Sequence, residues 1–155
     1  MSRKVIFEFD PFEIAGVDEP NPKTKKKVLQ DCADFALVQT FEYMNAQTSP
    51  VQGHGRFKKL TKDYKKIKVA QGGAPVPDLF LEGAMQGALK ASVKGGMVRL
   101  GVNGGKQGDK ADGHCNFSGE SELPLRRFVP NPEDGETFKK PILDGIRRIV
   151  REGQE

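Results

Sequence analysis

Apolar side chains occupy every second position near the start of the chain, at Val5, Phe7 and Phe9. This alternation predicts a β-strand with one apolar face. Pro11 either ends the strand or places it at the edge of a sheet, because proline cannot donate a ladder hydrogen bond. The polar segment 16–27, which contains prolines and many charges, is predicted as a linker or loop.

The pattern changes to helical spacing from Val28 to about Gln47. The apolar stripe, at steps of three and four residues, consists of Leu29, Cys32, Ala33, Ala36, Thr40 and Met44. Neighbouring apolar residues widen this stripe. A stripe this wide predicts a long helix that is buried on more than one side, either in the core or against another subunit.

The middle of the chain carries shorter signals. A basic helix is predicted from Leu60 to about Lys68, and residues 79–85 are predicted as a short helix or turn. Two strand-like segments, 88–93 and 97–102, flank a turn that contains Gly95 and Gly96. Together they predict a hairpin.

Glycines and prolines divide the last third of the chain. Residues 103–109 are predicted as a flexible glycine-rich loop, 110–118 as a brief helix and 123–129 as a strand. An amphipathic helix is predicted from about Thr137 to Arg151. Its apolar face consists of Phe138, Ile142, Ile146 and Ile149.

These elements predict an α+β fold, in which a small antiparallel sheet is packed by a long N-terminal helix and a C-terminal helix. Residues 1–27 would form an extended N-terminal arm with its linker, and residues 28–155 the α+β domain. A chain of 155 residues can bury one modest core. It contains no run of about 18 apolar residues and no continuous apolar segment of a secretion signal. Cys32 and Cys115 are therefore expected as free thiols in a reducing compartment.

Charge is distributed unevenly. The net charge is −3 over residues 1–22, +7 over 23–70 and zero over 71–155. The basic excess lies in KTKKK (23–27) and in 56–68, where Lys58, Lys59, Lys62 and Lys65 interleave with Phe57 and Tyr64. Three interpretations of 56–68 stay open: a solvated helix face, a site for a phosphate backbone, or a docking surface for an acidic partner.

The candidate chemical motifs are all incomplete. His114 and Cys115 are adjacent, but a metal site needs three or four converging ligands. The segment GVNGGKQGDK (101–110) has the wrong spacing for a phosphate-binding Walker loop, and Gln107 stands where a hydroxyl is needed. Glu120 and Glu122 are interpreted as solvated charges. We therefore expect no enzymatic activity, no cofactor and no metal.

Five segments in the second part of the chain form a recognisable order. They are GRFKKLTKDYKKIK (55–68), DLFLEGAMQGALKASV (78–93), the strand 97–102, GHCNFSG (113–119) and LPLRRFV (123–129). Their order and spacing resemble the virion morphogenesis, or tail-completion, proteins of tailed bacteriophages. The matching residues are Gly55, Phe57, Leu60, Thr61, Tyr64, Lys68, Leu79, Gly83, Met85, Ala88, Leu89, Ala111, His114, Asn116, Phe117, Leu123, Pro124, Arg126, Phe128 and Val129. The chain departs from the family pattern at Glu82, which replaces a hydroxyl residue, and at the inserted Cys115 and Ser118.

The resemblance implies a structural virion protein, assembled in the host cytoplasm. Its subunits would form a homo-oligomeric ring at the head–tail neck or the tail end, which completes or terminates the tail and joins it to the head. Its partners would be portal or head-completion proteins, or tail-tube proteins, with genomic DNA passing through the lumen without sequence-specific binding. No membrane partner is expected.

Contacts with other subunits or partners are expected at one set of residues: Phe7, Phe9, Lys58, Lys59, Lys62, Tyr64, Lys65, Arg126 and Phe128. The N-terminal arm would reach a neighbouring subunit and be disordered without it. Arg126 is expected to pair with a carboxylate, and its segment to form the third strand. The alternative function is a basic nucleic-acid-binding module, whose affinity would fall steeply with salt.

Overall fold

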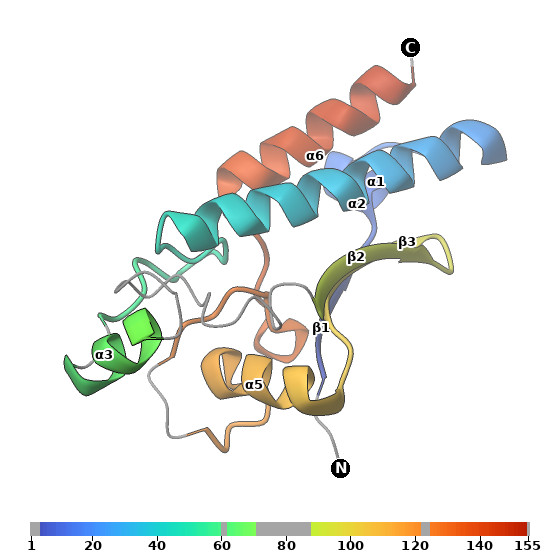
Figure 1. Cartoon of the computed structure of the whole chain (residues 1–155). Helices are drawn as coiled ribbons and strands as arrows, with labels where there is room; N and C mark the ends of the chain where they lie inside the picture. The colour runs from blue at the N-terminus through green and yellow to red at the C-terminus, as the bar shows by residue number, and fades with distance from the viewer. Residues whose placement is uncertain (1–3, 60–61, 71–87, 122–124, 155) are drawn as a thin grey trace.

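A computed structural model describes residues 4–59, 62–70, 88–121 and 125–154, and the structural statements below concern these residues. Its elements are β1 (Val5–Phe9), α1 (Pro11–Ala15), α2 (Pro22–Asn45), α3 (Lys62–Ala70), β2 (Leu89–Lys94), β3 (Met97–Val102), α5 (Gly105–Cys115), the 3-10 helix η1 (Pro132–Asp134) and α6 (Lys140–Gly153) (Figure 1). The segment predicted as a short helix or turn at 79–85 lies outside the described residues.

The described strands form an antiparallel sheet in the order β1-β3-β2. On β3, Val98, Leu100 and Val102 are buried, whereas the residues between them are half-buried. Helix α2 lies between this sheet and α6, and α5 lies on the opposite side of the molecule near the N-terminus (Figure 1). The predicted fold class, an α+β protein with a small antiparallel sheet and two packing helices, is confirmed.

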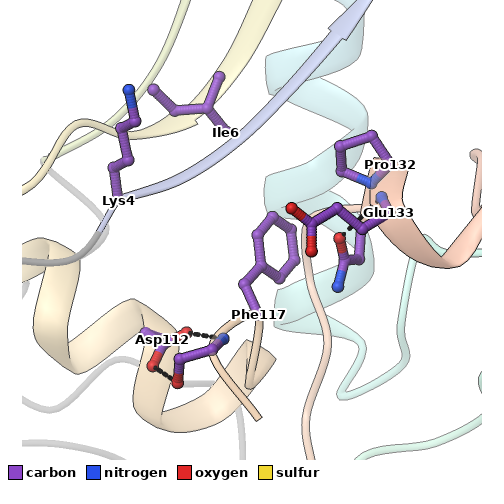
Figure 2. A pocket seen from close by; sticks show the side chains of 8 residues that line it. Lys4, Ile6, Asp112, Phe117, Pro132 and Glu133 are labelled. Atoms are coloured by element: carbon purple, nitrogen blue, oxygen red, sulfur yellow. Dashed lines mark hydrogen bonds between the residues drawn. The ribbon is translucent and has the colours of Figure 1, made fainter.

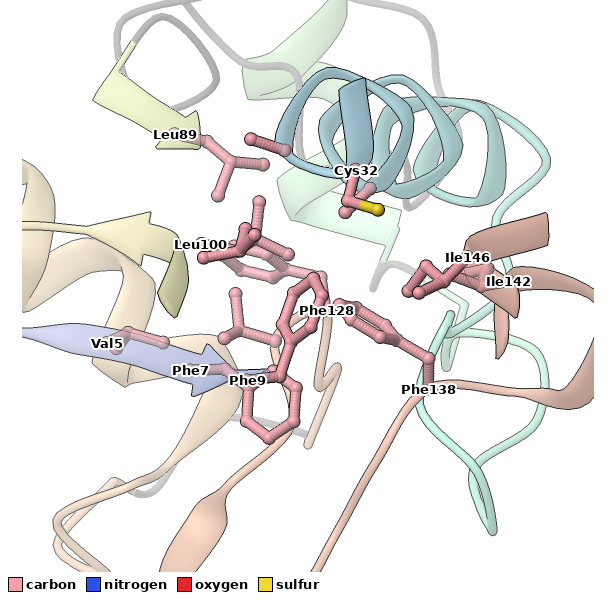
Figure 3. Packing of buried hydrophobic residues seen from close by; sticks show 14 of the residues in the cluster. Val5, Phe7, Phe9, Cys32, Leu89, Leu100, Phe128, Phe138, Ile142 and Ile146 are labelled. Carbon is pink, nitrogen blue, oxygen red and sulfur yellow. The ribbon is translucent and has the colours of Figure 1, made fainter. Parts of the chain in front are cut away.

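The core lies between the sheet and the two long helices. Phe7 and Phe9 each meet the ring of Phe138 edge-on, with ring centroids 5.3 and 5.5 Å apart. Figure 3 shows these rings gathered with Phe128 and with aliphatic residues of α6. At the crossing of α2 and α6, a Cβ at Gly145 would overlap the ring of Phe35. Glycine therefore permits the close approach of the two helices.

The prediction of an N-terminal arm is wrong. Val5–Phe9 pairs with β3 along its whole length, with Val5 opposite Val102 and Phe9 opposite Val98. Its apolar face is buried in the core of the same chain. The alternation identified the strand correctly, but its apolar face packs against Phe138 in the segment before α6, so no neighbouring subunit is needed to order it.

The prediction of a linker through residue 27 is also wrong, because α2 begins at Pro22. The side chain of Asn21 accepts a hydrogen bond from Thr24 N at 2.9 Å and caps the helix. Proline is well suited to the first helical position, since its missing N–H would have no partner there. The prolines that suggested a loop therefore mark the start of the helix.

Two predictions in the last third also fail. Helix α5 begins at Gly105, within the segment predicted as a flexible loop. Residues 125–129 do not form a strand, and β1 is the third strand of the sheet. Consecutive side chains from Arg126 to Val129 are buried, which differs from the alternate burial of a strand. The hairpin and the final helix are confirmed, although α6 begins at Lys140 and not at Thr137.

Candidate functional site

Beside the core, the loop after α2 meets two segments from the last third of the chain. Arg126 N donates to the His114 carbonyl at 2.8 Å and joins the segment before η1 to the end of α5. Ser49 Oγ donates to the Arg127 carbonyl and connects the loop after α2 to the same place. The segments 47–57, 113–121 and 125–136 thus form one layer of loops, which we call the loop layer.

Arg127 is the centre of the loop layer. Its Nε donates to the Cys115 carbonyl at 2.8 Å, and its Nη1 donates to Asp134 at 3.1 Å and to Glu136 at 3.0 Å. The guanidinium also lies over the ring of Phe117, 5.8 Å from its centroid. The side chain is 8% exposed, so these partners compensate a charge that has been removed from water.

Glu136 connects the network to the loop after α2. Its carboxylate accepts a hydrogen bond from Asn131 N at 2.9 Å and lies 2.5 Å from Nε2 of His54. Burial acts to raise the pKa of Glu136, but the Asn131 N–H, His54 and Arg127 outweigh it. The pKa of this carboxyl is therefore below its ordinary value, and the network favours the ionised form.

Arg126 and Phe128 occupy the same segment but face other neighbours. Arg126 Nε donates to the Lys58 carbonyl at 3.0 Å and its Nη2 to the Lys59 carbonyl at 3.4 Å. Phe128 is fully buried, and its N–H donates to Sγ of Cys115 at 3.4 Å. Arg126 therefore fixes the backbone that carries two exposed lysines.

The set of expected contact residues divides in two. Phe7, Phe9, Arg126 and Phe128 are buried within the chain, so their assignment to a partner surface is wrong. Their apolar or hydrogen-bonding surface is already occupied by the chain's own core and loops. By contrast, the side chains of Lys58 and Lys59 are exposed, and Lys65 is half-buried on α3. The side chains of Lys62 and Tyr64 lie outside the described part.

A pocket of about 330 Å³ lies between β1 and the loop layer (Figure 2). Ile6, Phe117 and Pro132 provide apolar walls. Asp112 lines one side and accepts hydrogen bonds from Ser118 N at 2.9 Å and Ser118 Oγ at 2.6 Å. This carboxylate is therefore already engaged by Ser118, and Lys4, Asn131 and Glu133 complete the polar part of the lining.

The chemistry of the loop layer is that of a scaffold. Burial raises the pKa of the Cys115 thiol to about 12, so the thiol stays protonated and is a poor nucleophile. Both cysteines are free, as the sequence predicted, and both are buried. Among the described residues, no group of three His, Cys, Asp or Glu side chains could hold a metal ion. Within the same residues, no helix has the length and apolar character needed to cross a membrane.

Sequence reasoning missed the central role of Arg127 and Glu136. One signal was available in the sequence. Two arginines, Arg126 and Arg127, stand next to each other in a mostly apolar segment, and the acidic turn PEDGE follows at 132–136. Adjacent arginines beside an acidic turn indicate local charge pairing.

Comparison with known proteins gives no family, since no family model, curated protein or solved structure matches the chain. The phage resemblance therefore depends on the sequence segments themselves.

Proposed function

We propose that this chain is a structural protein of a tailed-bacteriophage virion. It would assemble as a ring at the head–tail neck or the tail end, complete or terminate the tail, and join it to the head. The proposal begins from the ordered segments that resemble tail-completion proteins. The α+β fold class that the resemblance implies agrees with the fold described above.

The observation that carries the proposal is the meeting of these segments around Arg126 and Arg127. Three segments of the resemblance, near Gly55–Lys59, His114–Phe117 and Arg126–Val129, contact one another through these two arginines. The residues of these segments that match the tail-completion pattern therefore help to hold the subunit together. Segments that carry the resemblance and hold the subunit together are what we expect of a protein that works by assembling.

A partner surface is available on α3 and the segment before it. Ile67 and Val69 are 51% and 52% exposed, although both are large apolar side chains. Lys58, Lys59 and Lys66 are exposed in the same part of the sequence. Apolar side chains among lysines suit docking to an apolar patch with an acidic rim, because charge orients the approach and burial stabilises the contact.

The test is complementation of a phage whose copy of this gene carries a stop codon. We expect electron microscopy of the lysate to show filled heads and separate tails, or tails of uncontrolled length, and plasmid-borne wild type to restore joined particles. Ile67→Asp should fail to restore them. Val38→Asp is the matched control, since Val38 is equally exposed but lies on α2. Infectious virions without any copy of the protein would overturn the proposal.

The second candidate function is a basic nucleic-acid-binding module. The exposure of Lys58, Lys59 and Lys66 favours it, because a phosphate backbone requires accessible cations. Binding of a labelled duplex should then weaken steeply as salt rises, by about 0.9 in the logarithmic slope for each phosphate neutralised. Little affinity for DNA at physiological salt would exclude this candidate and leave the assembly proposal standing.

A further inference from the structure

A groove of about 670 Å³ separates the first turns of α2 from β2. Lys23, Lys26, Lys27 and Asp31 line it on the helix side, and Ala91 and Val93 are part of its strand side. Its volume is typical of sites that bind ligands or peptide segments. The groove shares no residue with the loop layer or with α3, so the inference below does not depend on the proposed function.

The strand side of this groove is a sheet edge. In the described residues β2 pairs only with β3 and forms one end of the sheet. In a hairpin with a two-residue turn, the residues that flank the turn form a hydrogen-bonded pair, and such pairs alternate along the ladder. By this rule Leu89, Ala91 and Val93 direct their backbone N–H and C=O groups away from β3. An extended chain can pair with groups placed in this way.

The helix side of the groove carries positive charge at an unfavourable place. The first turn of α2 contains no acidic residue, and Lys23, Lys26 and Lys27 lie near the N-terminus of the helix. The helix dipole is positive there, so cations at this end reduce the stability of the helix. Lys25 pairs with Glu19 at 2.9 Å, but within the described residues the other three lysines form no ion pair. An anionic partner would offset this cost.

The opposite face of β2 adds to the charge. Lys90 and Lys94 are exposed on the side of the strand that faces away from α2. A strand added to β2 would place alternate side chains toward the α2 lysines and the others beside Lys90 and Lys94. Opposite charges at such cross-strand positions stabilise a sheet. Both faces of an added strand therefore favour acidic side chains.

We propose that this groove binds an extended acidic segment of a partner protein, which adds as a strand to the outer edge of β2. Backbone pairing along β2 provides the direction and register, and the α2 lysines select acidic side chains. A nucleic acid fits less well, because its sugar–phosphate backbone cannot continue the hydrogen-bond ladder of the sheet.

The probe is a fluorescein-labelled peptide of about eight residues that alternates glutamate and threonine, a length that spans the strand. Fluorescence anisotropy with the full chain measures its affinity. We expect the combined change Lys23→Gln, Lys26→Gln and Lys27→Gln to weaken binding about tenfold or more. The matched control, Lys58→Gln, Lys59→Gln and Lys66→Gln, removes the same charge elsewhere and should change affinity less than about twofold. Equal losses in the two variants would overturn the proposal.

Strand addition is tested separately from charge. A glutamate–threonine peptide in which every amide is N-methylated keeps its charge but has no N–H to donate to β2, and we expect it to bind about tenfold more weakly. Ala91→Pro should weaken the glutamate–threonine peptide by a similar factor, because it removes an outward N–H of β2. Should that variant fail to fold, peptide with alternate N-methylated amides tests the same hydrogen bonds. Equal binding of pairing and non-pairing peptides, or tighter binding of a single-stranded oligonucleotide of equal charge, would refute strand addition.

Discussion

The core beneath α2 and the loop layer around Arg127 are stabilised by different forces. In the core, Phe7, Phe9 and Phe138 contact one another through ring edges and faces, without a buried charge among them. In the loop layer, one guanidinium reaches groups from two separate segments. The stability of an apolar core depends on the volume that its side chains fill, and it tolerates small changes in their orientation. The stability of a network around a buried cation depends on that one charged side chain. The comparison predicts different responses to mutation and to pH.

The largest effect is expected from truncation in the core. Phe138→Ala should lower the free energy of unfolding by about 3–5 kcal/mol, because it opens a cavity beside Phe7 and Phe9. Urea denaturation at neutral pH measures the change. Val38→Ala, at a position that is 52% exposed, should stay within about 0.5 kcal/mol of wild type. A loss below about 1 kcal/mol for Phe138→Ala would show that the core is not centred on this ring.

A somewhat smaller loss is expected in the loop layer. Arg127→Met should cost about 3 kcal/mol, because Glu136 and the Cys115 carbonyl lose their buried donor. Arg127→Lys should recover only part of this loss, since one ammonium group cannot replace a planar fork of donors. Arg147→Ala breaks a surface pair with Asp144 and a hydrogen bond to the Ile14 carbonyl, and should cost about 1 kcal/mol. Similar losses for Arg127→Met and Arg147→Ala would remove the distinction between buried and surface pairs.

Acid should act on the loop layer before it acts on the core. The pKa of Glu136 is lower in the folded protein than its ordinary value of 4.5. Its contribution to stability is therefore present above that value and is lost as pH falls through the folded pKa. Urea midpoints measured from pH 7 down to about pH 3 should fall more for wild type than for Glu136→Gln. An equal fall in both proteins would assign the acid sensitivity to other carboxylates.

The smallest expected effect is a change in how often each region opens locally, which the labelling rates of the two cysteine thiols can measure. Burial raises the pKa of both Cys32 and Cys115 to about 12, so each should react with a thiol reagent only when its region opens. Cys32 belongs to α2 in the core, and Cys115 ends α5 in the loop layer. In single-cysteine proteins, Arg127→Met should speed the labelling of Cys115 more than that of Cys32. Equal acceleration would mean that the two regions open together.

The sequence predicted the elements whose pattern is periodic. The alternation at Val5, Phe7 and Phe9 identified β1, and the glycine pair between two apolar segments identified the hairpin. Helical spacing identified most of α2 and α6. In each case one face is buried and the other is not, so local periodicity carries the information. What periodicity could not give was the partner of β1, because pairing between distant segments has no local signature.

The loop layer was harder to predict for a related reason. Arg126 and Arg127 are adjacent in sequence, yet one fixes the backbone at Lys58 and the other binds Cys115 O and Glu136. Their roles follow from tertiary contacts between segments, which no spacing rule specifies. Arg127, the neighbour of the arginine for which the sequence analysis expected a carboxylate partner, pairs with Asp134 and Glu136.

The pairing of the first strand with β3 also sets an order of events during synthesis. Val5 pairs with Val102, so roughly 100 residues must be translated before β1 can meet its partner, which takes about 5–20 s at ordinary rates. Throughout that interval β1 has no partner strand, and Phe138, whose ring covers Phe7 and Phe9, has not yet been synthesised. A ribosome stalled before β3 would therefore present β1 as an apolar nascent strand without its partner.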